Sequence, residues 1–271
     1  MKVAALQMVS TPGVEENLAA ARRLLAGAAA GGAELAVLPE YFCVMGRTES
    51  DKLALREAAG VGPIQQFLAA SAKEFGLWIA GGTLPIATAD ANRVRNTTFV
   101  YSPSGECVAQ YDKIHLFRFD NGRESYDESR VIESGSAPVT FDLPARDGRT
   151  WRVGLSICYD LRFPELYRAH AAAGADLLLV PSAFTHTTGS AHWEVLLRAR
   201  AVENLCYVLA AAQGGTHLNG RRTWGHSMLV DPWGQVLAQK DEGEGMADGV
   251  LDAGRIAQCR MQLRALDHRV V

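Results

Sequence analysis

The sequence lacks several features that mark particular classes of protein. No run of five or six like charges occurs, and 27 Lys and Arg nearly balance 30 Asp and Glu, which leaves a net charge of −3. Proteins that bind nucleic acid or a membrane surface usually carry a basic field, so this balance argues against both partners. No apolar stretch approaches the roughly 18 residues needed to span a bilayer. Residues Met1–Asn17 hold one lysine and a short apolar run broken by Gln7, so we expect no signal peptide.

Cysteine is scarce and scattered. The five cysteines, at positions 43, 107, 158, 206 and 259, are far apart, odd in number and never spaced as Cys-x-x-Cys. This usage favours a reducing cytoplasm over a disulfide framework. The seven histidines do not cluster with cysteines or carboxylates at ligand spacings, so we expect no metal site. With 48% hydrophobic residues and no Gly/Ser-rich linker, the chain is expected to form one domain over residues 1–271.

What the sequence does contain is a duplication. Four pairs of similar segments run in the same order: Val3–Met8 with Val153–Cys158, Ala33–Phe42 with Ala175–Phe184, Leu77–Ala80 with Tyr207–Ala210, and Pro103–Gln110 with Pro232–Gln239. Self-similarity of this kind indicates repeated supersecondary structure. We therefore interpret the chain as two related halves of roughly 130 to 150 residues each.

Each half predicts short strands alternating with helices. The apolar runs Leu35–Leu38 and Leu177–Val180 are too short for helices and suit strands buried on both faces. Apolar spacing and Gly/Pro punctuation predict four helices, over residues 14–28, 63–75, 164–174 and 192–203. Pro103–Gly105 and Pro232–Gly234 are typical of hairpin turns. Two sheets packed face to face between helical layers follow: an α/β, four-layer α-β-β-α sandwich with an internal pseudo-two-fold duplication.

Cys158 is the first candidate for chemistry. It ends the strand Val153–Cys158 and precedes the helix expected from Pro164. The positive end of a helix dipole favours a thiolate, so the position suits a nucleophile. Free cysteine is also often a core residue, and the position alone leaves both interpretations open.

Glu40 and Lys113 are the second and third candidates. Glu40 follows a very apolar strand, which favours a general base of raised pKa over a loop glutamate or a buried ion pair. Lys113 closes the strand from Cys107, where a solvated lysine is the ordinary expectation. The duplication changes that expectation, because in the other half Glu40, Cys158 and Lys113 correspond to Ser182, Met8 and Glu242. The two halves therefore differ in chemistry at their strand ends, where open α/β sheets bind ligands.

Three motifs that contain these residues resemble the signature segments of the nitrilase superfamily of carbon–nitrogen hydrolases. They are Leu-Pro-Glu-Tyr at Glu40, Tyr-Asp-Lys-Ile-His-Leu-Phe at Lys113, and Gly-Leu-Ser-Ile-Cys-Tyr-Asp-Leu-Arg-Phe-Pro-Glu at Cys158. The resemblance covers nearly the whole chain and implies the α-β-β-α sandwich and a Glu40–Lys113–Cys158 catalytic triad. It also implies a fourth acidic residue, which matches Glu128, and no metal or organic cofactor.

The resemblance implies amide hydrolysis through a thioester. Cys158 would attack the carbonyl, with Glu40 moving the proton and Lys113 facing the oxyanion beside the backbone N–H of Tyr159. Glu128 would orient Lys113 or assist proton transfer. His115, close to Lys113, either contacts substrate or orients its loop.

The substrate is expected to be a small amide that carries a carboxylate. The segments Pro181–Thr185, Thr188–Glu203, Ala210–Gly215 and Gly225–Gly234 resemble the Nit branch, and within it amidases that hydrolyse deaminated glutathione in metabolite repair. Pocket candidates, chosen for their positions beside the catalytic segments, are Phe117, Arg162, Phe184 and Thr185. The resemblance also implies a homodimer.

Other functions remain open. An ω-amidase acting on 2-oxoglutaramate or 2-oxosuccinamate, or a broader aliphatic amidase or carbamoylase, is the nearest alternative, and a nitrile hydrolase is more distant. A non-catalytic scaffold would tend to lose a triad member, and all three are present. A redox sensor built on Cys158 would need a resolving cysteine, for which only Cys43 is a candidate.

Overall fold

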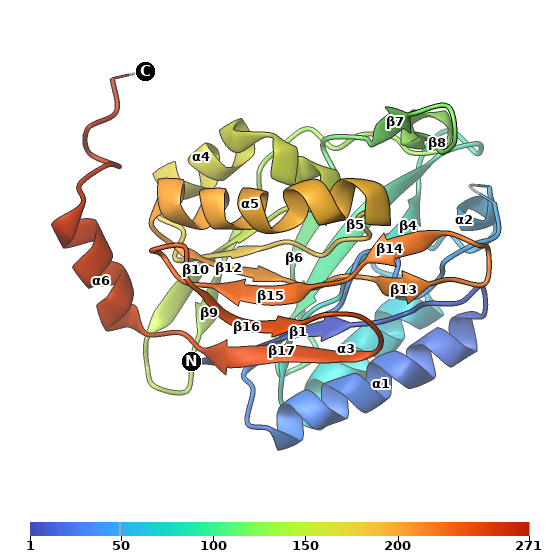
Figure 1. Cartoon of the computed structure of the whole chain (residues 1–271). Coiled ribbons are helices and arrows are strands. Elements are labelled where there is room, and N and C mark those ends of the chain that lie inside the picture. Colours follow the sequence, from blue (N-terminus) through green and yellow to red (C-terminus); the bar gives the residue numbers. More distant parts are fainter. Residues whose placement is uncertain (49, 271) are drawn as a thin grey trace.

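Two β-sheets lie face to face at the centre of the computed structural model, and helices cover their outer faces (Figure 1). The structure describes residues 1–48 and 50–270. The first half of the chain forms β1 (Lys2–Gln7), α1 (Val14–Ala30), β2 (Leu35–Val37), α2 (Asp51–Ala54), α3 (Pro63–Phe75), β3 (Trp78–Ala80), β4 (Leu84–Ala87), β5 (Val94–Tyr101) and β6 (Cys107–Asp112).

A small hairpin and a 3-10 turn connect the halves: β7 (Arg118–Asp120), β8 (Ser125–Asp127) and η1 (Glu128–Arg130). The second half forms β9 (Thr140–Pro144), β10 (Thr150–Leu155), η2 (Cys158–Arg162), α4 (Pro164–Ala172), β11 (Leu177–Leu179), α5 (His186–Asn204), β12 (Tyr207–Ala210), β13 (Gly214–Thr216), β14 (Arg222–Trp224), β15 (Ser227–Val230) and β16 (Val236–Lys240). The chain continues through β17 (Gly245–Val250) and α6 (Ala253–Gln262).

The two sheets share one strand order. The first runs β17-β1-β2-β3-β5, with β4 and β6 both paired to β5, and the second runs β9-β10-β11-β12-β15-β16. Each begins with an antiparallel edge strand, continues with three parallel strands, and ends with antiparallel strands. This correspondence confirms the predicted four-layer sandwich and its duplication.

The core lies on both faces of the central strands. In β1, Val3 and Ala5 pack into the cluster shared by the two sheets, and Ala4 and Leu6 pack into the cluster under α1 and α3. All four side chains are completely buried. Strands that are buried on both faces need apolar residues at successive positions. Continuous apolar runs therefore predicted these strands, whereas a half-exposed strand would alternate apolar and polar residues.

The helix boundaries agree with the sequence for α1, α3 and α4, but the prediction for α5 was wrong at its start. This helix begins at His186, six residues before the predicted His192. Thr185 is its N-cap, and its hydroxyl accepts a hydrogen bond from the Thr188 N–H at 3.3 Å. The first turns contain Thr, Gly and Ser, which have weak helix propensity, so the cap rather than the composition fixes the boundary.

No helix within the described part of the chain is long and apolar enough to cross a membrane.

Candidate active site

The three candidate residues each follow a strand, and the fold brings these strand ends together. Glu40 lies three residues after β2, Lys113 directly after β6, and Cys158 three residues after β10. Cys158 has a left-handed backbone, with φ of 49°, and its N–H donates to the Pro181 carbonyl at 2.9 Å. A non-glycine residue in this conformation is strained and is held by its surroundings. The sharp turn separates Cys158 from the regular path of β10.

Lys113 lies between two buried carboxylates. Its Nζ donates to Glu40 Oε1 at 2.9 Å and to Glu128 Oε2 at 2.8 Å and Oε1 at 3.0 Å. Burial alone would lower the pKa of Lys113, but Glu128 and Glu40 raise it well above its ordinary value. Burial opposes ionisation of Glu128 as well, yet Lys113 and then Lys52 lower the pKa of that carboxyl. Lys113 is therefore an ammonium and Glu128 a carboxylate at neutral pH.

Glu40 is held from several directions. Its Oε1 also accepts from Asn96 Nδ2 at 2.9 Å, and its Oε2 accepts from the Ala183 N–H at 3.0 Å. Its backbone carbonyl accepts from Gln213 Nε2 at 3.1 Å, a contact between the two halves of the chain. With 1% of its surface exposed, the carboxylate has little freedom to reorient.

The Cys158 thiol and Glu40 line the same cavity, and the protonation state of the thiol differs from the sequence expectation. The helix end was expected to favour the thiolate. Instead burial, and then the neighbouring Glu40 charge, raise the pKa of the Cys158 thiol well above its ordinary value, and Lys113 only partly opposes them. The resting group is a thiol, and a base in contact with it is needed for attack.

Asp160 is a site residue that the sequence reasoning missed. Its Oδ2 accepts from the Ile157 N–H at 2.9 Å, next to Cys158. Its Oδ1 accepts from the His115 N–H at 2.9 Å and lies 2.7 Å from His115 Nδ1. The His115 ring also stacks on Phe163 at 3.7 Å. These contacts tie the Lys113 loop to the Cys158 turn and support loop orientation as the role of His115.

The predicted pocket residues line one cavity of about 280 Å³ together with Glu40, Glu128 and Cys158. The predicted pocket residues Phe117, Arg162, Phe184 and Thr185 all line it, and so does Tyr159, which was predicted as a backbone donor. Three further lining residues were missed: Ala183, Thr188 and Arg221. The cap pattern of α5 could have pointed to Thr188, but Arg221 lies in the β13–β14 turn, between two motif segments and in neither of them. Lys113 is behind this wall rather than on it, in contact with both carboxylates.

Arg162 contributes positive charge to the cavity. Its guanidinium lies 5.3 Å from the Phe184 ring centroid and 5.7 Å from that of Tyr159. Its Nη1 is 3.1 Å from His192 Nδ1 on α5. An arginine stacked between aromatic rings keeps a fixed direction and is well suited to a planar carboxylate.

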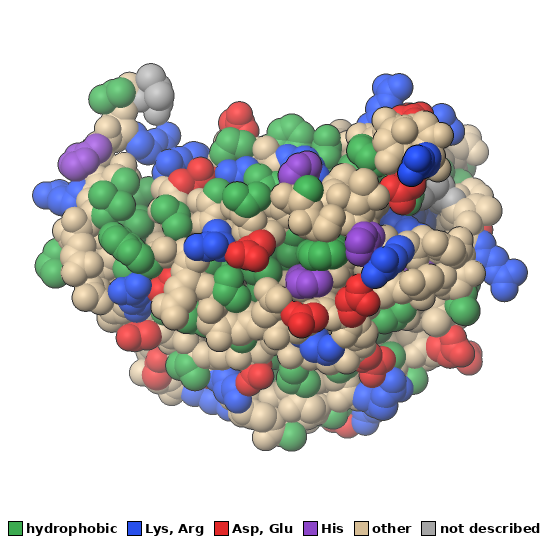
Figure 2. Space-filling model, viewed as in Figure 1, with side chains coloured by type: hydrophobic (Ala, Val, Ile, Leu, Met, Phe, Trp, Pro, Cys, Tyr) green, Lys and Arg blue, Asp and Glu red, His purple; other side chains and the backbone are tan. Residues whose placement is uncertain are grey.

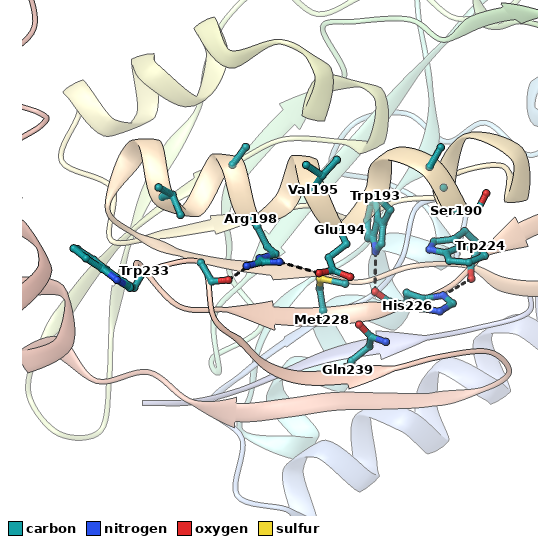
Figure 3. Close-up of a pocket in the computed structure, with 15 residues that line it drawn as sticks. Ser190, Trp193, Glu194, Val195, Arg198, Trp224, His226, Met228, Trp233 and Gln239 are labelled. Carbon is teal, nitrogen blue, oxygen red and sulfur yellow. Dashed lines mark hydrogen bonds and ion pairs between the residues drawn. The ribbon is translucent and has the colours of Figure 1, made fainter.

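A larger groove lies on the outer face of α5, away from the site residues. Figure 3 shows Trp193, Glu194, Val195 and Arg198 of this helix along the groove, with Trp233 of the β15–β16 turn at one end and Trp224 at the other. None of the predicted catalytic or pocket residues lines it. Among the described residues there is also no group of three or more His, Cys, Asp or Glu placed to hold a metal ion.

Comparisons with known proteins agree on one relationship. The sequence model of the carbon–nitrogen hydrolase family matches residues 2–261. The deaminated glutathione amidase of Synechocystis sp. strain PCC 6803 / GT-S is 42% identical over 270 residues, which are 98% of this chain and 97% of that protein. The crystal structure of the C. elegans NitFhit protein superposes with a TM-score of 0.88 at 36% identity, covering 99% of this chain and 65% of the other.

A third relative has been seen with a covalently modified active-site cysteine. An amidase of the nitrilase superfamily from Nesterenkonia sp. AN1 is 29% identical, with a TM-score of 0.80, and covers 99% of this chain and 95% of the other. In one variant of that amidase, the acetamide moiety of fluoroacetamide is covalently added at the active-site cysteine. These findings confirm the resemblance seen in the sequence motifs.

Proposed function

The chain belongs to the carbon–nitrogen hydrolase family, and on that premise we propose that it hydrolyses the amide bond of deaminated glutathione through a thioester on Cys158. The observation that carries the proposal is that the buried Cys158 thiol and Glu40 line one cavity, and that Lys113 donates a hydrogen bond to Glu40 from behind its wall. Relatives named deaminated glutathione amidase, up to 42% identical over nearly the full chain, support this substrate.

In the first step the Cys158 sulfur forms a bond to the amide carbonyl carbon. The thiol proton passes to Glu40, whose side chain lines the same cavity as the thiol. The raised pKa of the thiol makes this transfer necessary, since little thiolate exists at neutral pH. Glu40 then returns the proton to the departing nitrogen as the carbon–nitrogen bond breaks, which leaves a thioester and a free amine.

The oxyanion that forms on the carbonyl oxygen needs positive charge at a fixed position. We assign this role to the Lys113 ammonium and the backbone N–H of Tyr159. Glu128 holds Lys113 by two hydrogen bonds of 2.8 and 3.0 Å and so acts as a positioning residue. It also keeps Lys113 charged while Glu40 cycles between its two protonation states.

In the second step water attacks the thioester carbon. Glu40 takes a proton from the water, the carbon–sulfur bond breaks, and the proton returns to the sulfur. The products are 2-oxoglutarate and cysteinylglycine. Every proton transfer uses a protein group that lines the same cavity as the thiol, and the mechanism uses no cofactor.

Arg162 is our candidate for binding the carboxylate of the acyl group, because its guanidinium lines the cavity beside Phe184.

An ω-amidase activity on 2-oxoglutaramate is the second candidate function, and the small volume of the cavity, about 280 Å³, favours it. Steady-state kcat/KM on the two substrates separates the candidates, since an equal or better value on 2-oxoglutaramate would reverse their order.

The direct test is to trap the intermediate. The protein is mixed with deaminated glutathione, quenched in acid and digested, and the Cys158 peptide is weighed by mass spectrometry. We expect a mass increase equal to the 2-oxoglutaryl group on that peptide. An adduct on Cys43 instead, or a peroxide-induced Cys43–Cys158 disulfide with no acyl adduct, would contradict the mechanism.

A homodimer is part of the proposal. The outer face of α5 and the neighbouring hairpin expose Val195 at 61% and Trp233 at 50%, beside the groove in Figure 3. Figure 2 shows hydrophobic side chains among charged ones on this face of the molecule. Exposed apolar residues gathered around a groove are typical of protein interfaces. Light scattering on the Trp233→Ala variant tests this surface. We expect the variant to dimerise less than the unaltered protein, whereas a dimer that forms through another surface would be insensitive to the change. A cytoplasmic location stays a prediction of the sequence.

A further inference from the structure

A second cleft lies next to the active-site cavity and shares Arg221 with it. Three loops form its walls: the segment between β2 and α2, the tip of the β7–β8 hairpin, and the β13–β14 turn. Figure 1 shows α2 and both hairpins gathered at the same end of the molecule. The cleft has a volume of about 1000 Å³, including space open to solvent.

The walls of this cleft are rich in positive charge. Among the described lining residues, four are cationic, namely Arg47, Lys52, Arg123 and Arg221, and Glu124 is the one carboxylate. Glu124 Oε2 accepts a hydrogen bond from Thr187 Oγ1 at 2.8 Å, which directs it toward α5. Cationic side chains on three separate loops around one cavity favour an anionic ligand.

Two contacts attach the cleft to the catalytic groups. Tyr41 lines the cleft, and its hydroxyl donates to Glu128 Oε1 at 2.8 Å. Arg221 lines both cavities, and its Nη2 donates to the Ala183 carbonyl at 2.9 Å. The Ala183 N–H in turn donates to Glu40. The active-site cavity and the cleft therefore adjoin at Arg221.

We propose that this cleft binds the leaving-amine half of the substrate and recognises a carboxylate at its far end. The inference rests on the proposed function. The acyl group must stay in place throughout the thioester stage, which suits the small cavity, whose walls include the buried Glu40, Cys158 and Thr185. The amine must leave before water attacks, which suits a larger cleft open to solvent.

Size supports the same division. The active-site cavity has a volume of about 280 Å³ and the cleft a volume of about 1000 Å³, both including space open to solvent. An acyl group and a dipeptide do not both fit there, so the dipeptide extends outward. A short amide that releases ammonia makes no contact with the cleft. The cleft thus selects peptide-like amides over primary amides by binding the carboxylate of the group that departs.

The test compares substrates in a double variant and a matched control. Arg47→Ala/Arg123→Ala removes two exposed cations of the cleft, and Arg118→Ala removes an exposed cation from the same β7–β8 hairpin that does not line the cleft. Three substrates are measured: deaminated glutathione, its form with a C-terminal carboxamide, and 2-oxoglutaramate. The readout is the ratio of kcat/KM between substrates, which a general loss of active protein does not move.

In the double variant we expect the preference for deaminated glutathione over 2-oxoglutaramate to fall about tenfold, chiefly through KM. The unaltered protein should favour the carboxylate over the carboxamide by a similar factor, and the double variant should lose that preference. Arg118→Ala should keep both ratios. Unchanged ratios in the double variant would overturn the cleft assignment alone. If the unaltered protein fails to turn over deaminated glutathione, the proposed function and the cleft ligand are both overturned.

Discussion

The two halves of the chain share one scaffold and differ at the ends of corresponding strands. Where the first half has Met8 after β1, the second has Cys158 after β10. Where the first has Glu40 after β2, the second has Ser182 after β11. All four side chains are buried. Strand interiors carry the packing in both sheets, so the strand ends were free to diverge without loss of the fold. The first half supplies Glu40 and Lys113, and the second supplies the thiol and most of the pocket wall.

The largest expected effect comes from the thiol itself. Cys158→Ala should lower kcat by about 10⁴-fold or more, because no other group in the proposal bonds to the substrate. Its counterpart, Met8→Leu, conserves volume in a buried position and should leave activity unchanged at a cost below about 1.5 kcal/mol. Turnover assays and thermal melts of both variants measure the contrast. Equal losses of activity in the two variants would mean that Cys158 and its counterpart Met8 do not differ in their role in catalysis.

Glu40→Gln should have the next largest effect. The amide keeps the shape of the side chain but cannot take the proton from the thiol, so kcat/KM should fall by about 10²- to 10⁴-fold. Circular dichroism should show an intact fold. Near-normal turnover of this variant would remove Glu40 as the base and direct attention to Glu128.

Glu128→Gln probes a charge in the segment that connects the two halves. The pKa of Glu128 is lower in the folded protein than its ordinary value of 4.5. Its carboxylate therefore stabilises the fold fully above the unfolded-state pKa, and this stabilisation is lost as the pH falls through the folded value. At pH 7 the variant should be less stable by about 3 kcal/mol, since Lys113 loses a buried partner. Urea titrations should show that the difference in unfolding free energy between the unaltered protein and the variant narrows below about pH 4.5. A difference that does not depend on pH would contradict this.

The smallest effect is expected at Ser182, the counterpart of Glu40. Its hydroxyl donates to the Val180 carbonyl at 3.3 Å. Ser182→Ala should cost about 1 kcal/mol or less in unfolding free energy and leave kcat within about twofold. The same assays as for Glu40→Gln apply. A loss approaching that of Glu40→Gln would show that the two positions share a role in the site.

Much of the fold could be predicted because its signals are local. The apolar runs at residues 35–38 and 177–180 and the turns at 103–105 and 232–234 recur in order, and the sheets repeat that order. The start of α5 could not be read from composition, because the cap formed by Thr185 outweighs the weak propensity of the turns that follow.

The site was predictable as far as its motifs extend. Glu40, Lys113 and Cys158 stand in distinctive segments, and the geometry brings them together. Asp160 and Arg221 were missed for different reasons. Asp160 is inside the Cys158 motif, but its role depends on hydrogen bonds to residues up to 49 positions away. Arg221 reaches the cavity only because a distant hairpin folds over it. The direction of the Cys158 pKa shift was predicted wrongly, because the burial of this thiol depends on the packing of both halves.

The pairing of β17 with β1 has a consequence for biosynthesis. Residues 245–250 supply the edge strand of a sheet that residues 2–7 begin, with six paired positions along their length. A nascent chain that has reached only residue 240 has both halves of the duplication but leaves one side of β1 unpaired. Such an edge is open to strands from neighbouring nascent chains. Translation must therefore proceed past Val250 before the first sheet closes, which makes its final pairing a late, long-range event.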